Sequence, residues 1–192
     1  MHFICKAAAV RHWTPIGNAS NNYKGRFNGN NHTVSGLYFN KNQTDYVGLF
    51  GYVSDYSCHI ENTGVIDSYF SGSYYVGGVV GYKNGGTIEN CYNTSTVAGY
   101  NSIGGIAGYN RGSIINCYNE GAINGEFHTG GIVGTSATSE VIDCYNTGAI
   151  NAYRGVGGTV GNNAYSASIT NCYSTGTVKG YEYVGLLVGY ND

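Results

Sequence analysis

Residues 76–99 read VGGVVGYKNGGTIENCYNTSTVAG, and units of the same design follow at Ile103, Thr129 and Val156. These units read IGGIAGYNRGSIINCYNEGAING, TGGIVGTSATSEVIDCYNTGAIN and VGGTVGNNAYSASITNCYSTGTVKG. Shorter copies stand at Val47 (VGLFG) and at Val184 (VGLLVGYND). The glycine that closes each opening motif recurs about every 27 residues. A repeat of this period is typical of a stacked array, in which each unit buries its apolar face against its neighbours.

The apolar segments within a unit are short, rich in Val, Ile and Tyr, and separated by Gly and Asn, which is the pattern of β-strands. Three strand-like pieces fit one period: VGGVVG, TIENCY and the TV of STVAG. Paired helices are excluded, because glycine is scattered through every segment and each would cost about 1 kcal/mol in a helix. We therefore predict an all-β β-helix (β-solenoid) of about six to seven coils.

The chain is expected to form a single domain. We assign residues 1–12 to an N-terminal arm and residues 13–192 to the solenoid, with first coils in 13–46 and repeats in 47–192. Because the sequence stops within a repeat and opens without a signal peptide, we interpret it as a fragment of a longer array.

Composition excludes several classes of function. Only 10% of the residues are charged and the net charge is −2, so a nucleic-acid partner is not expected. No run of 18 or more apolar residues occurs, so no membrane insertion is expected.

Stacking of coils about 4.8 Å apart places equivalent residues in columns along the axis. Two aliphatic columns should face the core, and they are Ile60, Ile88, Ile114, Val141, Ile169 and Val97, Ile123, Ile150, Val178. A third column is also small and aliphatic, and it consists of Val80, Ala107, Val133, Val160 and Val188. The column of Val79, Ile106, Ile132, Thr159 and Leu187 is adjacent to the third one. Neighbouring strand residues point to opposite faces, so either the paired glycines form a bulge or one column is covered from outside.

Polar columns follow the second strand. Asn62, Asn90, Asn116, Asp143 and Asn171 should form a left-handed corner whose stacked amides bond along the axis. Cys91, Cys117, Cys144 and Cys172 should be buried, unreactive thiols. Disulfides between rungs would strain the stack, and a straight column cannot supply a tetrahedral zinc site.

No catalytic residue, metal site or cofactor is expected. Glu61 and Glu89 share a column, which gives them a carboxylate spacing near that of retaining glycosidases, but nothing converges on the pair. The histidines (2, 12, 32, 59 and 128) are dispersed without ligand spacing. Lys83 and Arg111 are expected to be solvated in loops.

One surface is a candidate for binding: Tyr92, Tyr118, Tyr145 and Tyr173 follow the cysteines and should point outward as a flat aromatic strip. Such a strip suits an extended glycan, and Asn93, Asn119, Asn146 and Ser174 could add hydrogen bonds beside it. The alternative is that the strip only stabilises the sheet, at roughly 0.2–1 kcal/mol per pair.

The recurring VGGVVG, IGGIAG and VGLLVG motifs, each of the complete copies followed by I-x-N-C-Y-N or a close variant, resemble the GLUG motif family. The upstream WTPIGN and FNGNNHTVSGLYF resemble the segment that leads into such repeats, so the resemblance covers residues 13–192. It implies a right-handed parallel β-helix on a secreted or surface protein of bacteria, as in adhesin-like proteins and N-terminal regions of immunoglobulin A peptidases. It brings no binding residues, and the peptidase motif H-E-x-x-H is absent from the sequence.

These observations favour a non-enzymatic stalk or adhesion surface located outside the cell or on a bacterial cell surface. The expected partners are host or environmental glycans or surface proteins, together with end-to-end self-association through open strand edges. The alternatives are a carbohydrate-active β-helix (lyase or hydrolase) and a glycan-binding module without chemistry.

Overall fold

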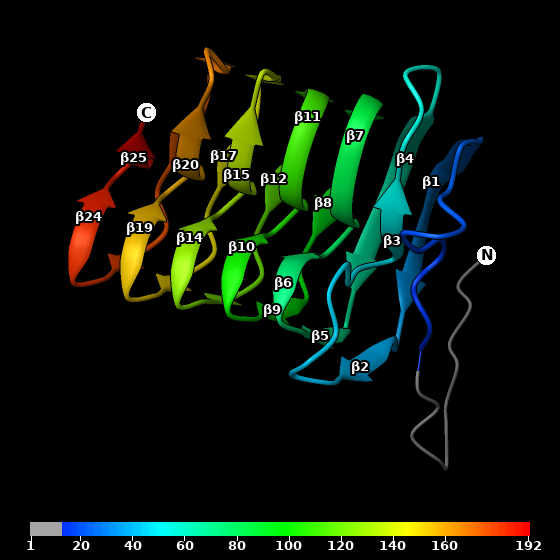
Figure 1. Ribbon diagram of the computed structural model, residues 1–192, viewed down its shortest axis with the longest axis horizontal. Helices are drawn as coiled ribbons and strands as arrows, with labels where there is room; N and C mark the ends of the chain where they lie inside the picture. The colour runs from blue at the N-terminus through cyan, green and yellow to red at the C-terminus, as the bar shows by residue number, and fades with distance from the viewer. Residues whose placement is uncertain (1–12) are drawn as a thin grey trace.

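The computed structural model describes residues 13–192, and every regular element in this part of the chain is a β-strand. The strands pair in parallel and stack one rung on the next along the longest axis of the molecule, from blue to red in Figure 1. The prediction of a parallel β-helix is therefore confirmed. The arm assigned to residues 1–12 lies outside the described residues.

Three sheets run the length of the molecule. Sheet 1 has fourteen strands, which are β1 (Arg26–Ser35), β3 (Phe50–Val53), β4 (His59–Ile66), β7 (Val80–Glu89), β8 (Tyr92–Asn93), β11 (Ala107–Ile115), β12 (Tyr118–Asn119), β15 (Val133–Ala137), β16 (Glu140–Ile142), β17 (Tyr145–Asn146), β20 (Val160–Ala164), β21 (Ser168–Thr170), β22 (Tyr173–Ser174) and β25 (Val188–Asn191). Sheet 2 has six, which are β2 (Tyr38–Asn40), β5 (Tyr69–Ser71), β9 (Thr96–Ala98), β13 (Ile123–Asn124), β18 (Ile150–Asn151) and β23 (Val178–Lys179). Sheet 3 has five, which are β6 (Tyr74–Gly77), β10 (Asn101–Gly104), β14 (Phe127–Gly130), β19 (Arg154–Gly157) and β24 (Glu182–Gly185).

The predicted core columns are confirmed. Ile60, Ile88, Ile114 and Val141 are fully buried, and Ile169 is partly buried in the last complete rung. The columns of Val80 and Val97 are buried in the same way. The core is therefore a tube of aliphatic side chains enclosed by the three sheets.

The sequence predicted that the motif VGGVVG forms one strand, and this is wrong because the motif is divided between two strands. β6 ends at Gly77 and β7 begins at Val80, so the chain bends between sheets 3 and 1 at residues 78–79. Because Val79 stands in the bend, it and Val80 both point inward and are both fully buried. The bend resolves the conflict between the two adjacent aliphatic columns.

A left-handed corner ends the long strand of sheet 1. Asn62, Asn90, Asn116, Asp143 and Asn171 have φ of 54°, 51°, 49°, 53° and 54°. Their side chains also form the predicted ladder, which we call the outer ladder: Asn90 Nδ2 donates to Asn62 Oδ1 at 3.1 Å and Asn116 Nδ2 to Asn90 Oδ1 at 2.6 Å. Asp143 accepts from Asn171 Nδ2 at 3.0 Å but, as a carboxylate, has no proton to donate onward.

A second left-handed column was not predicted. It lies within the strands of sheet 3. There the backbone pairing of β10 with β6 joins Asn101 to Tyr74 and Ile103 to Val76, and the residue between each pair is left out of the pairing. Within the strands that column consists of Tyr75, Ser102, His128, Gly155 and Tyr183, and Tyr46, which precedes the bridge of Val47 to Val76, continues it; each has φ between 48° and 65°.

The cysteine column is buried behind the corner. Cys91, Cys117 and Cys144 are free and almost fully covered, which confirms the predicted burial of these three thiols. Each thiol lies close to a carbonyl of its own rung, as in the 3.2 Å contact from Cys91 Sγ to Glu89 O. Burial raises the pKa of the Cys117 thiol. Cys172 is also free but only half-buried, because no further rung covers it.

Candidate functional site

The predicted tyrosine strip is a stack of parallel rings on sheet 1. The ring centroids of Tyr92 and Tyr118 are 4.9 Å apart with an interplanar angle of 1°, and those of Tyr118 and Tyr145 are 4.9 Å apart with an angle of 2°. Tyr173 continues the stack at 5.3 Å and is 54% exposed. Burial and the neighbouring rings raise the pKa of Tyr118. In this arrangement the ring faces cover one another, and the edges and hydroxyls are what an approaching ligand meets.

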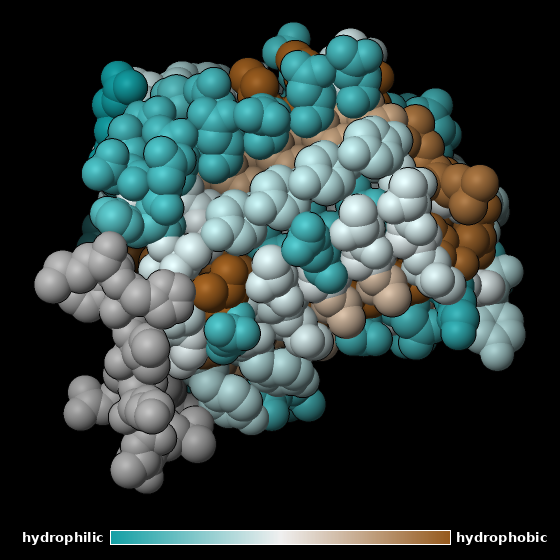
Figure 2. All heavy atoms as spheres, turned by 180° about the vertical axis from the view of Figure 1, so that it is seen from behind, coloured by the Kyte–Doolittle hydropathy of each residue, from teal (hydrophilic) through white to brown (hydrophobic). Residues whose placement is uncertain are grey.

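The rear of the molecule carries aromatic rings in line along the axis. Strands β8, β12 and β17, which hold the stack, lie behind the other strands in Figure 1, and Figure 2 shows a row of ring side chains running along that side. The structure thus brings the four predicted binding residues together in one line.

Three of the four residues that follow the tyrosines are not available to a ligand, which corrects the expectation from the sequence, and the fourth, Ser174, is half-buried. Asn93, Asn119 and Asn146 are fully buried and form an inner ladder. Asn93 Nδ2 donates to Asn119 Oδ1 at 2.8 Å, and Asn119 Nδ2 donates to Asn146 Oδ1 at 2.8 Å. The second proton of each amide is donated to a carbonyl two residues on, as from Asn93 to Ser95 O at 2.9 Å. Alternation along the strand explains this, since outward tyrosines require inward asparagines.

A second aromatic column, absent from the sequence analysis, runs along the start of the sheet 3 strands. Its centroid distances are 5.8, 5.3, 6.2 and 5.6 Å, and three of the four contacts are edge-to-face. Tyr100, Tyr153 and Tyr181 are 47%, 41% and 85% exposed. Because the rings are tilted against one another, they are not mutually covered as in the parallel stack. We call this set the groove column, and its members are Tyr74, Tyr100, Phe127, Tyr153 and Tyr181.

A groove lies beside that column, between sheets 2 and 3. One part, of about 580 Å³, is lined by ten residues: Asn42, Ser71, Gly72, Ser73, Ala98, Gly99, Tyr100, Asn124, Gly125 and Glu126. A second part, of about 220 Å³, continues over the next rungs and shares Gly125 and Glu126 with the first. Small residues recur on successive rungs, so the groove follows the axis, with polar side chains and tyrosines along it.

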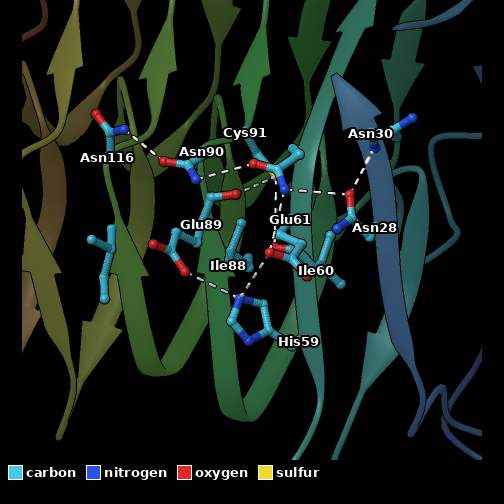
Figure 3. Close-up of polar contacts among 12 residues, drawn as sticks. Asn28, Asn30, His59, Ile60, Glu61, Ile88, Glu89, Asn90, Cys91 and Asn116 are labelled. Atoms are coloured by element: carbon cyan, nitrogen blue, oxygen red, sulfur yellow. Dashed lines mark hydrogen bonds and ion pairs between the residues drawn. The ribbon is translucent and has the colours of Figure 1, made fainter. Parts of the chain in front are cut away.

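One cluster of titratable side chains forms on the outer face of sheet 1. His59 and Glu61 are two residues apart on β4, and Glu89 of β7 is in register with Glu61. His59 Nε2 lies 3.2 Å from Glu89 Oε2 and 3.9 Å from Glu61 Oε2 (Figure 3). From the sequence, the two glutamates were expected to form a pair and His59 to be isolated. His59 and Glu61 are two positions apart on one strand, so their side chains point to the same face. This spacing was the signal in the sequence that could have placed them together.

Lys83 is not solvated in a loop, as the sequence analysis expected, but is fully buried within β7. Its ammonium donates to Gly86 O at 2.7 Å and to Asn110 Oδ1 at 3.1 Å. Desolvation lowers the pKa of Lys83 to about 7. Arg111 lies in β11 and is exposed.

Within residues 13–192, no helix is long and apolar enough to cross a membrane.

Comparison with known proteins agrees with this architecture. The protein is similar to halomucin of Haloquadratum walsbyi, with 37% identity over 97 residues, which is 49% of this chain and 1% of halomucin. It is also similar to a protein of Evansella cellulosilytica named "Putative Gly-rich membrane protein", with 31% identity over 80 residues, 41% of this chain and 9% of that protein. The chain therefore spans a small part of the curated relatives it matches.

Among solved structures, the chain resembles that of "a putative immunoglobulin A1 protease from Bacteroides ovatus". The TM-score is 0.60 with 19% sequence identity, over 93% of this chain and 74% of the other. At this level of identity the likeness concerns the fold alone.

The family model described as "The GLUG motif" matches four consecutive segments, residues 72–98, 99–124, 125–151 and 152–179. Each segment covers one rung of the solenoid, with its strands of sheets 1, 2 and 3. The matched segments make up more than half of the sequence, and the chain belongs to the GLUG motif family.

Proposed function

We propose that this chain is a non-enzymatic repeat segment of a surface or secreted protein, in which it acts as a stalk and as an adhesion surface. The observation that carries the stalk role is the continuity of side-chain columns along the axis. The tyrosine stack, the outer and inner ladders and the thiol column each bond one rung to the next. Most polar side chains of these columns therefore contact the adjacent rungs, which is the arrangement expected of a scaffold.

The relatives support the same reading. Halomucin and the Gly-rich membrane protein carry names that point to the cell surface, and the chain matches only a small share of each. A repeat array that fills part of a much longer protein is suited to spacing other parts of it from the surface. We accordingly propose a location outside the cell or on its surface.

Adhesion is the second function, and two aromatic surfaces are candidates for it. The stack of Tyr92, Tyr118, Tyr145 and Tyr173 remains a proposed binding strip through its edges and hydroxyls. The groove column is the better platform for sugar rings, since its rings are tilted and Tyr100, Tyr153 and Tyr181 are well exposed. The groove beside it adds Asn42, Ser71 and Asn124 as hydrogen-bonding groups. Its extension over several rungs favours an extended glycan over a compact ligand.

A glycan array probed with the purified chain tests adhesion, and two matched double variants separate the surfaces. Tyr100→Ser with Tyr153→Ser removes rings from the groove column, whereas Tyr118→Ser with Tyr145→Ser removes rings from the stack. We expect the groove variant to lose at least tenfold in glycan affinity with a small change in melting temperature. The stack variant should retain glycan binding but lose stability, since stacked pairs contribute about 0.5–1.5 kcal/mol each.

Loss of binding in the stack variant alone would move the adhesive site to the tyrosine strip. If the wild-type chain binds no glycan on the array, the adhesive role is rejected and the stalk role stands by itself. The stalk role fails if the chain does not resist proteolysis as a folded rod.

A further inference from the structure

We propose that His59, Glu61 and Glu89 form a binding site for a divalent transition-metal ion of the zinc type, with water completing the coordination shell. The three side chains come from two adjacent rungs at the N-terminal half of sheet 1 (Figure 3). They form a group in which one ligand atom from each lies within 4.8 Å of the other two.

The distances are close to those of a chelate. Zinc–nitrogen and zinc–oxygen bonds of about 2.0–2.2 Å place neighbouring ligand atoms roughly 3.0–3.5 Å apart. His59 Nε2 and Glu89 Oε2 are already 3.2 Å apart, and His59 Nε2 and Glu61 Oε2 are 3.9 Å apart. The separation of His59 and Glu61 exceeds this range by roughly 0.4 Å, so the Glu61 carboxylate must shift by a small amount to complete the chelate.

The backbone that carries the ligands is held rigidly. Ile60 and Ile88, which alternate with the three ligands, are fully buried and fix the outward direction of their neighbours. Asn62 Nδ2 donates to Glu61 Oε2 at 3.3 Å. Asn62 is in turn held in the outer ladder by Asn90, so the carboxylate is oriented by a neighbour as metal-ligating groups commonly are.

The type of ion follows from the ligands and their exposure. Imidazole suits zinc, nickel and other first-row ions, whereas calcium and magnesium prefer oxygen ligands alone. The side chains of His59, Glu61 and Glu89 are 23%, 22% and 36% exposed, so water can reach the remaining coordination positions.

The cluster is particular to these two rungs. Later rungs carry Ile115, Ile142 and Thr170 in the glutamate column, and the histidine column continues as Thr87 on the rung of Glu89 and as Ser113, Glu140 and Ser168 on later rungs. Two carboxylates directly opposite each other destabilise a sheet unless a cation joins them. Arg26 is beside His59 in the preceding strand, yet its guanidinium is in none of the ion pairs formed within residues 13–192. The competing account is that His59 alone, without a metal ion, contacts the two carboxylates.

Titration of the chelator-treated chain with Co²⁺, followed by visible absorption, tests the proposal. Cobalt bound by nitrogen and oxygen gives d–d bands without thiolate charge transfer, so coordination by a cysteine is recognised directly. We expect one ion per chain at this site and a rise in melting temperature on binding.

Variants assign the ion to the cluster. His59→Gln and Glu89→Gln should each weaken Co²⁺ binding at least tenfold. His32→Gln, a second imidazole on the neighbouring strand β1, and Glu140→Gln, a carboxylate in the histidine column, should leave it unchanged. Circular dichroism confirms that each variant is folded.

Two results would overturn the proposal. No cobalt uptake by the wild-type chain would leave His59 in contact with the two glutamates without a metal ion. Uptake that persists in both His59→Gln and Glu89→Gln would place the ion elsewhere. Broadening of amide signals around β4 and β7 by Mn²⁺ gives an independent location in the unmodified protein.

Discussion

Thr159 is the one hydroxyl in the buried column that contains Val79, Ile106 and Ile132. It is fully buried, and its Oγ1 finds no hydrogen-bond partner within residues 13–192. An unsatisfied buried hydroxyl costs roughly 1–3 kcal/mol.

We predict that Thr159→Val raises the free energy of unfolding by about 1–2 kcal/mol, measured by denaturant titration. Thr129→Val is the control, since Thr129 Oγ1 bonds to Phe127 O at 3.4 Å and its removal should not stabilise. Equal stability of Thr159→Val and the wild type would show that the hydroxyl is satisfied by water.

Lys83 makes stability depend on pH. Its folded pKa of about 7 is below the ordinary value of 10.5, so between these values the unfolded chain binds more protons than the native one. Stability contributed by this group therefore rises with pH from about 7 and is lost as pH falls toward 7. Burial also raises the pKa of Cys58 from 9.0 to about 11, which lowers stability above pH 9, so the useful window is pH 7 to 9.

We predict that Lys83→Met flattens this dependence. The wild type should gain stability across the window by an amount on the order of 1–3 kcal/mol, and the variant should gain much less. Chemical denaturation at several pH values measures the difference. Parallel curves for the two proteins would mean that Lys83 stays protonated through the window, with its charge stabilised by Gly86 O and Asn110.

The sequence predicted the role of a residue correctly where the residue type and its place in the repeat indicate the same conformation. Asn at a corner position indicates the left-handed conformation, and five of five residues from Asn62 to Asn171 adopt it. It failed for Lys83, because lysine is ordinarily a surface residue and only the inward parity of β7 reveals its burial. It also missed the conformation of Tyr75 and Tyr183, which have positive φ although tyrosine does not favour it.

At the scale of the element, the paired glycines set the corner between sheets 3 and 1. A Cβ on Gly105 would lie 2.3 Å from Asn119 Cγ and 2.3 Å from Gly131 O. The second glycine of the motif thus leaves space for the inner ladder, which links two parts of the repeat that are distant in sequence. We predict that Gly105→Ala destabilises the chain by about 1–3 kcal/mol or more through overpacking, measured by thermal and denaturant unfolding.

Gly25→Ala is the matched control for that variant. Its Cβ would meet the hydroxyl end of the Tyr23 side chain at 3.0 Å, which can move aside. A loss at Gly25 as large as that at Gly105 would refute the link between the paired glycines and the ladder.

Element boundaries were less predictable than columns. The motif VGGVVG has the composition of one strand, and the bend within it depends on contacts with the adjacent rung and with the ladder. The sequence located the Tyr92 strip but not the groove column, because Tyr74, Tyr100, Phe127, Tyr153 and Tyr181 vary in type and flank the motif. The residues that face one another on neighbouring rungs can be identified only when the pairing register of the strands is known.

At the scale of the whole molecule, the C-terminal rung leaves apolar side chains uncovered. Val184, Leu186 and Leu187 are 46%, 81% and 39% exposed, and Figure 2 shows apolar atoms gathered at the right-hand end of the molecule. The strand edges of β21 to β25 are also open to pairing. We predict that the chain self-associates end to end as its concentration rises, measured by sedimentation velocity.

Leu186→Lys should shift that association to higher concentration. Tyr56→Lys, a change at an 89% exposed loop residue away from this rung, should leave it unchanged. A single monomeric species for the wild type over a wide concentration range would contradict the prediction.

The inner ladder has a consequence for how such a protein changes over generations. Asn119 and Asn146 each accept a hydrogen bond from the rung before and donate one to the rung after, in a register that runs from Asn93 to Ser174. A 27-residue unit copied in frame can therefore be inserted between two existing rungs without remaking the contacts of either. Unequal recombination within the gene would lengthen or shorten the rod in steps of about 4.8 Å, so that reach from the surface becomes a heritable quantity set by copy number.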